Sequence, residues 1–167
     1  MGVGFVGRRR GGDGVDEIVF QTNAPPRPAD GPAPPTRRED LLDVSDARLA
    51  GLEPSAIDRV VVSNAIGWLA SHPDCVERTR ACCINLSGAT INTANIGFYR
   101  GLLETFDLPP EKLCFEVTET SAVTHFRAAV EFMGAIRAAG CSFALDDFGA
   151  GMSSFEYLRE LPVEKIK

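Results

Sequence analysis

Two kinds of hydrophobic pattern alternate along the later part of the chain. Short apolar runs that end in polar residues occupy residues 83–88, 112–120, 142–147 and 163–167. Asn85 and Glu116 are 31 positions apart, and Glu116 and Asp146 are 30 apart. Strand–helix units typically need roughly 30 residues each. The four runs therefore predict four strands, separated by helical connections.

The segments between these runs have helical spacing. Residues 93–106, 123–138 and 154–161 each carry apolar side chains three or four positions apart on one side. Gly140 follows the second segment and Pro162 follows the third, as residues that end helices do. The pattern therefore predicts three helices that alternate with the strands.

A globular pattern begins at Ser55, where Ser55-Ala-Ile-Asp58 resembles a capping box that opens a helix. One face of this helix is apolar and contains Ile57, Val61, Ala65, Trp68 and Leu69. Strands that alternate with helices form a parallel sheet with right-handed crossovers. Because polar residues gather at the carboxyl ends of such strands, we expect Asn85, Glu116 and Asp146 to point toward one locus.

The most distinctive stretch runs from Ser142 to Phe155. Its apolar run ends in the adjacent carboxylates Asp146 and Asp147, and a glycine-rich turn and two serines follow. Two acids at a strand end suit divalent cations, which prefer hard oxygen ligands. The alternative is an ordinary turn, because acidic residues and glycine also favour turns.

The first 54 residues differ in composition from the rest. Residues 1–14 are rich in glycine and arginine, and residues 25–35 hold six of the eleven prolines. Such a segment buries little apolar surface, so we expect a disordered or extended leader over residues 1–54, with a short strand at 16–21 as an option. Gly2-Val-Gly4-Phe-Val-Gly7 matches a dinucleotide fingerprint only formally, because no strand precedes it.

Four ordered motifs resemble those of the EAL-domain family, the cyclic di-GMP phosphodiesterases of bacterial second-messenger signalling. They are Asn85-Leu-Ser-Gly, Glu116-Val-Thr-Glu119, Asp146-Asp147-Phe-Gly-Ala-Gly-Met-Ser-Ser and Leu161-Pro-Val-Glu-Lys-Ile-Lys167. The resemblance covers residues 55–167. It implies an α/β fold, here a partial (β/α)8 TIM-type barrel with about four strand–helix units, and hydrolysis of one phosphodiester of cyclic di-GMP by two metal ions.

The resemblance also implies a role for each motif residue. Metal ligands for Mg²⁺ or Mn²⁺ are implied at Asn85, Glu116, Asp146 and Asp147. Catalytic roles are implied at Lys167, which resembles the lysine that contacts the attacking water or the phosphate, at Asp147, and at Glu119, which resembles the glutamate that braces the glycine-rich loop. The plain alternatives are a turn asparagine, a solvated acid at a strand end and a solvated terminal lysine.

The chain departs from the family pattern in two places. The family's Glu-Ala-Leu motif, whose glutamate is a metal ligand, is expected about 55–60 residues before Asn85, and residues 23–36 contain no such motif. The family's glutamate and glutamine on the last two strands lie beyond Lys167. Three interpretations follow: an active phosphodiesterase, a degenerate domain that binds nucleotide or a protein partner, and a truncated reading frame. We expect weak metal binding and little or no hydrolysis.

Charge and composition limit the classes of partner that the sequence favours. The net charge of −6 argues against general nucleic-acid binding. The five cysteines form no CxxC motif and suit a reducing cytoplasm. No apolar run reaches the 18 or so residues of a membrane span. Four strands cannot close a barrel that needs eight, so we expect a homodimer or another signalling domain to cover the open edges.

Overall fold

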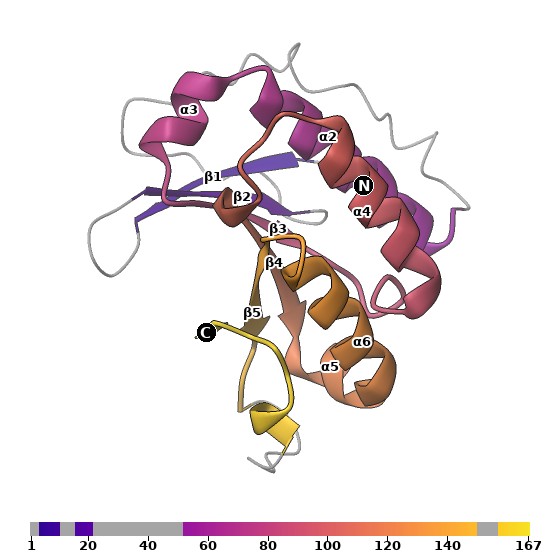
Figure 1. Cartoon of the computed structure of the whole chain (residues 1–167). Helices are drawn as coiled ribbons and strands as arrows, with labels where there is room; N and C mark the ends of the chain where they lie inside the picture. Colours follow the sequence, from indigo (N-terminus) through magenta and orange to yellow (C-terminus); the bar gives the residue numbers. More distant parts are fainter. Residues whose placement is uncertain (1–3, 11–15, 22–51, 150–156) are drawn as a thin grey trace.

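A computed structural model describes residues 4–10, 16–21, 52–149 and 157–167 (Figure 1). Its sheet has six strands in the order β1-β2-β3-β4-β5-β6. They are β1 (Gly4–Arg10), β2 (Asp16–Gln21), β3 (Ala81–Asn85), β4 (Leu113–Thr118), β5 (Ser142–Asp146) and β6 (Lys165–Ile166). β1 pairs with β2 in antiparallel fashion, and every later pair is parallel. The four strands predicted from the apolar runs are confirmed as adjacent, parallel and in sequence order.

Helices connect β3 to β4 and β4 to β5, as the spacing predicted. The described helices are α2 (Pro54–Ala70), α3 (Pro73–Arg78), α4 (Ile96–Thr105), α5 (Glu119–Thr124) and α6 (Phe126–Arg137), with 3-10 turns at Thr93–Asn95, Pro110–Lys112 and Tyr157–Arg159. The expected stop after α6 is present, because Gly140 has φ of +103° and its N–H donates to the carbonyl of Arg137. None of the described helices has the length and apolar character needed to cross a membrane.

One face of the sheet packs against helices, which lie together on one side in Figure 1. This face carries large side chains from β3, β4 and β5, and they share one core with α2, α4 and α6. Tyr99 of α4 is at its centre, with its ring edge-to-face against Phe115 at 5.9 Å and Phe132 at 5.5 Å. The apolar faces predicted for these helices are therefore the faces that cover the sheet.

The opposite face of the sheet is built differently. Its buried apolar residues are small, namely Ala81, Cys83, Cys114 and Ala144, and they form a separate cluster. Side chains alternate between the faces of a strand, so the residues two positions further along β3, β4 and β5 lie on this second face as well. Those residues are Asn85, Glu116 and Asp146.

The start of the chain contributes two strands to the sheet. Residues 4–10 and 16–21 lie in these strands, so both segments take the extended alternative. The reason is physical: β2 pairs with β3 from Glu17–Ala81 to Phe20–Ile84 and satisfies a strand edge that would otherwise be unpaired. The option of a strand at 16–21 is confirmed, while residues 22–51 are outside the described part.

Two local expectations about helix ends are also revised. The capping box at Ser55 is wrong, because α2 begins at Pro54 after Glu53 and no side chain caps it. In the helix expected at 154–161, the described portion forms only the 3-10 turn at Tyr157–Arg159, and residues 154–156 are outside the described part.

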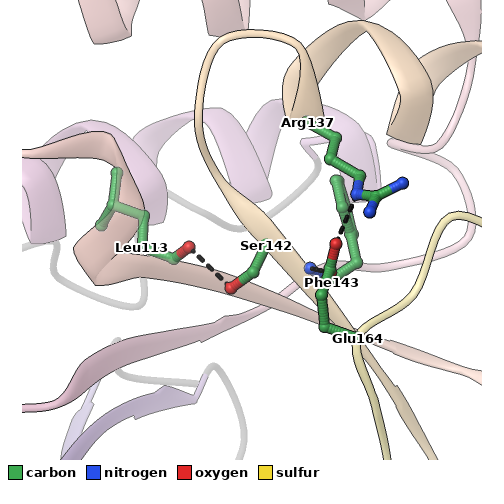
Figure 2. Close-up of polar contacts among 5 residues, drawn as sticks. All are labelled: Leu113, Arg137, Ser142, Phe143 and Glu164. Carbon is green, nitrogen blue, oxygen red and sulfur yellow. Dashed lines mark hydrogen bonds and ion pairs between the residues drawn. The ribbon is translucent and has the colours of Figure 1, made fainter.

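A polar contact at the amino end of β5 fixes the returning chain (Figure 2). The Glu164 carboxylate accepts a hydrogen bond from the Phe143 N–H at 2.8 Å and pairs with the Arg137 guanidinium. The Glu164 N–H in turn donates to the Phe143 carbonyl at 3.0 Å. Beside it, the Ser142 hydroxyl donates to the Leu113 carbonyl at 3.1 Å, which ties β5 to β4.

Candidate functional site

The register of the sheet brings the predicted site residues to one edge. Asn85 pairs directly with Glu116 across β3 and β4. Glu116 pairs with Ala144 of β5, and Ala144 pairs with Lys165 of β6. Because side chains alternate, Asp146 and Lys167 share a face with Glu116. The expectation that residues far apart in sequence meet at the carboxyl edge thus agrees with the strand register.

The buried anion at this edge is Glu116, which is only 2% exposed. Its carboxylate is paired with the ammonium group of Lys167, whose side chain is 17% exposed. A buried carboxylate is costly unless a positive charge compensates it. The lysine therefore has a structural partner, and its position is set by backbone bonds from the Lys167 N–H to the Leu145 carbonyl and from the Phe148 N–H to the Lys167 carbonyl.

The two adjacent aspartates are presented differently. Asp146 ends β5 and is half-buried, whereas Asp147 is exposed and has φ of +54°. The Asp147 N–H donates to a carboxylate oxygen of Asp146 at 3.1 Å. Asp tolerates this left-handed conformation better than most residues. The turn therefore separates the two carboxylates immediately after the strand.

A residue that directly follows β4, Glu119, holds the described part of the glycine-rich segment in place. Glu119, 2% exposed at the start of α5, accepts a hydrogen bond from the Gly149 N–H at 2.8 Å. Its other oxygen accepts one from the Tyr157 hydroxyl, and this bond raises the pKa of Tyr157 to about 12. One carboxylate therefore links both sides of the segment from Gly149 to Tyr157, as a bracing residue would.

Sequence reasoning missed a third buried carboxylate, Asp58 of α2, which is 4% exposed. One of its oxygens accepts three hydrogen bonds, from the Ser87 N–H at 2.7 Å, the Ser87 hydroxyl at 2.6 Å and the Thr90 hydroxyl at 2.6 Å. These donors are in the loop that follows Asn85. The signal was present in the sequence, because Asp58 is three positions before Val61, on the apolar face of the helix.

A neighbouring contact fixes the same loop. The Arg59 guanidinium donates to the side-chain oxygen of Asn95 at 2.6 Å and lies 4.7 Å from the centre of the Phe98 ring. The Asn95 side-chain nitrogen donates to the Thr90 carbonyl at 2.8 Å. Asp58 and Arg59 thus tie the whole connection between β3 and α4 to α2.

A pair of thiols lies on the same face of the sheet, two residues before Asn85 on β3 and two residues before Glu116 on β4. Cys83 and Cys114 pair in register across β3 and β4, and both are fully buried. The neighbouring thiol raises the pKa of Cys83 and lowers that of Cys114. Cys82, on the other face, has its pKa raised to about 12 by burial.

The donor set can be tested against the metals that it implies. Carboxylate and amide oxygens suit Mg²⁺ and Mn²⁺. Glu116 and Asp146 differ by two register positions and one strand, so their backbone positions are about 8 Å apart. Among the described residues, no three His, Cys, Asp or Glu side chains come together as a metal-binding group. The donors therefore fit hard cations in kind.

Comparison with known proteins agrees with the family resemblance seen in the sequence motifs. The family model for the EAL domain matches residues 44–167. The chain is 38% identical over 112 residues to the cyclic di-GMP phosphodiesterase PdeB of Shewanella oneidensis, which covers 66% of this chain and 13% of that protein. It is 44% identical over 66 residues to the cyclic di-GMP phosphodiesterase RocR of Pseudomonas aeruginosa, which covers 40% of this chain and 17% of that protein.

Solved structures show the same relationship. The EAL domain of FimX superimposes with a TM-score of 0.70 at 27% identity, covering 99% of this chain and 63% of that one. The FimX EAL domain from Pseudomonas aeruginosa bound to c-di-GMP gives a TM-score of 0.64 at 25% identity, covering 99% of this chain and 62% of that one. The chain therefore spans less than two-thirds of these domains and less than a fifth of the two curated relatives.

Proposed function

The chain belongs to the EAL-domain family, and on this premise we propose that it is a cyclic di-GMP phosphodiesterase domain of bacterial second-messenger signalling. The observation that supports this proposal most strongly is the strand register. It places Asn85 beside Glu116, and Asp146 and Lys167 on the same face of the neighbouring strands. An anionic phosphodiester needs such a set, because it repels an attacking anion unless positive charge is held beside it.

We assign the following roles within this proposal. Asn85, Glu116, Asp146 and Asp147 hold the cations. Two Mg²⁺ or Mn²⁺ ions held there would supply charge neutralisation and a water of lowered pKa. Lys167 pairs with a carboxylate oxygen of Glu116, which keeps its ammonium group at the same edge. We assign Lys167 the role of contacting the attacking water or a phosphate oxygen.

Glu119 is proposed to act indirectly, without touching the reacting atoms. Its carboxylate holds the Gly149 N–H, two residues after Asp147. Groups that orient a metal ligand typically change affinity or activity by 10–100-fold when they are removed. Glu119 is therefore proposed as a positioning residue that keeps the turn after β5 in place.

A second candidate function is nucleotide or partner binding without turnover, and one observation favours it. β2 lies beside β3, and Phe20 of β2 pairs with Ile84, immediately before Asn85. Phe20 and Gln21 end β2, and neither is acidic. β2 therefore ends in residues that are not acidic, whereas the family's Glu-Ala-Leu motif supplies a glutamate. We therefore propose weak Mg²⁺ or Mn²⁺ binding with little or no hydrolysis, in the cytoplasm. A second copy or another signalling domain is the proposed partner at the β6 edge.

The test is turnover of cyclic di-GMP to the linear dinucleotide by the purified chain at saturating Mn²⁺, together with calorimetric titration of Mn²⁺. Asp146→Asn is expected to abolish metal binding. The matched control is Asp74→Asn, at an exposed position on α3, which should bind as the parent does. Gln21→Glu adds one carboxylate at the end of β2 and should tighten Mn²⁺ binding.

The outcomes separate the two candidates. Robust turnover that is lost in Asp146→Asn establishes the phosphodiesterase and overturns the expectation of weak activity. Binding of cyclic di-GMP without turnover in either the parent or Gln21→Glu establishes the binding domain. Metal binding that survives Asp146→Asn would refute the assigned donor set.

A further inference from the structure

The thiol pair behind the polar edge has no part in the proposed function. All five cysteines are free. Cys83 and Cys114 differ from the others because they are register partners on adjacent strands and face the same side of the sheet. Cys82 pairs instead with Leu113 and lies in the core on the opposite face. Only this pair among the described cysteines therefore combines adjacent strands with a shared face.

The geometry of a parallel sheet puts this pair within reach of a covalent bond. Neighbouring strands lie about 4.7–4.9 Å apart, and disulfides join Cα atoms roughly 4.4–6.8 Å apart. The Cβ atoms of register partners are separated by about the same 4.8 Å, whereas a disulfide prefers about 3.8 Å. A bond here is therefore possible but strained, and strained disulfides are the easily reduced ones.

We propose that Cys83 and Cys114 are a redox-sensitive site that forms a reversible disulfide between β3 and β4 when the protein meets a peroxide. The sulfur of one thiol attacks an oxygen of the peroxide and becomes a sulfenic acid, the O–O bond breaks, and the thiol proton leaves with the departing hydroxide as water. The second thiol attacks the sulfenic sulfur, its proton leaves with the departing hydroxide as water, and the S–S bond forms. Two thiols and one hydrogen peroxide thus give one disulfide and two waters.

The surroundings of the pair favour this product over others. Both sulfurs are fully buried among Ala81 and Ala144, so a large oxidant or a third thiol has no direct route to them. Hydrogen peroxide is little larger than water. Asn85 and Lys167, at the nearby carboxyl edge, are only half-buried, so local opening of this edge would admit it. A sulfenic acid formed on one sulfur has the other thiol as its adjacent partner.

A disulfide here would also act on the polar edge. Cys83 is two residues before Asn85, and Cys114 is two residues before Glu116. Drawing the strands together at the thiols would change the directions in which these two side chains point. The predicted consequence, weaker Mn²⁺ binding after oxidation, rests on the function proposed above, whereas formation of the bond does not.

The experiment uses the full chain, treated with hydrogen peroxide at low protein concentration, then denatured, alkylated and digested with trypsin. The expected product links peptide 81–100 to peptide 113–127 within one chain, with two alkylatable thiols lost and all five regained after dithiothreitol. Because peptide 81–100 contains both Cys82 and Cys83, variants assign the bond. Cys83→Ala and Cys114→Ala should abolish it, and the matched control Cys82→Ala should keep it.

Fragmentation of the linked peptides from the parent chain gives the same assignment if a variant does not fold. Five thiols that remain alkylatable after peroxide treatment would overturn the proposal. So would a linkage through Cys82, or a bond between two chains. Failure of the Mn²⁺ effect with the disulfide formed would count against the proposed metal site alone.

Discussion

Replacing Asp58 by alanine tests whether α2 holds the loop that follows Asn85. Asp58 is 4% exposed, and one of its two carboxylate oxygens accepts hydrogen bonds from the Ser87 N–H, the Ser87 hydroxyl and the Thr90 hydroxyl at 2.6–2.7 Å. Thr90 itself is fully buried, so water does not readily replace the lost acceptor. The change therefore leaves at least one buried donor without a partner.

The magnitude follows from the number of donors and from their sharing of one oxygen. A hydrogen bond to a charged group contributes roughly 1.5–3 kcal/mol, and an orphaned buried donor costs about 1–3 kcal/mol. Three bonds to one atom are not additive. We therefore expect Asp58→Ala to lower the free energy of unfolding by about 3–5 kcal/mol. Asp58→Asn keeps the shape and one acceptor, so it should cost about 1–2 kcal/mol.

Urea unfolding followed by circular dichroism measures both variants, and Asp107→Ala, at an exposed loop position, is the matched control. A loss of 3–5 kcal/mol is a large fraction of a typical domain's stability, so the asparagine variant is the more informative one. A double-mutant cycle with Thr90→Val should give a coupling energy above about 0.5 kcal/mol. Unchanged stability in Asp58→Ala, or additive effects in the cycle, would refute the tether.

Two further predictions concern other carboxylates. Glu164→Ala removes the acceptor of the Phe143 N–H and should cost about 1–3 kcal/mol in urea unfolding; Arg137→Gln should cost under about 1 kcal/mol, because the side chains of that ion pair are 51% and 34% exposed. An equal loss of unfolding free energy in Glu164→Ala and Arg137→Gln would contradict this prediction. Tyr157 keeps its proton in the fold, with its pKa raised from 10.0 to about 12, so its contribution to stability is complete below pH 10 and is lost as pH rises from 10 to 12. Tyr157→Phe should flatten that decline, and an unchanged decline would rule out a contribution from this hydroxyl.

The order and direction of the strands could be predicted because the information is local. Each strand is marked by a short apolar run, and each helix by apolar residues three or four positions apart. Strands that alternate with helices along the chain then favour a parallel sheet. The carboxyl edge follows from the same reasoning, which is why Asn85 and Glu116 were placed together. The register pair Asn85–Glu116 itself could not be derived, because it depends on packing between segments 31 positions apart.

The expectations that failed depended on distant partners. Ser55 and Asp58 have the spacing of a helix cap. The Asp58 carboxylate instead accepts a hydrogen bond from Ser87, 29 positions away, and does not cap its own helix. The composition of residues 4–10 predicts no strand, yet β1 pairs with β2 along its length. In both cases a group that must be satisfied, a buried hydroxyl or an open strand edge, decided the structure.

The two faces of the sheet explain why the polar edge is held in register. Phe115 and Phe143 pair on the helix-covered face, while Glu116 and Ala144 pair on the other. Because side chains alternate along a strand, slipping β4 by one residue would exchange Phe115 with Glu116. That slip would bury a carboxylate in the aromatic core and lose its pairing with Lys167. The large hydrophobic residues of one face therefore fix where the donors of the other face lie.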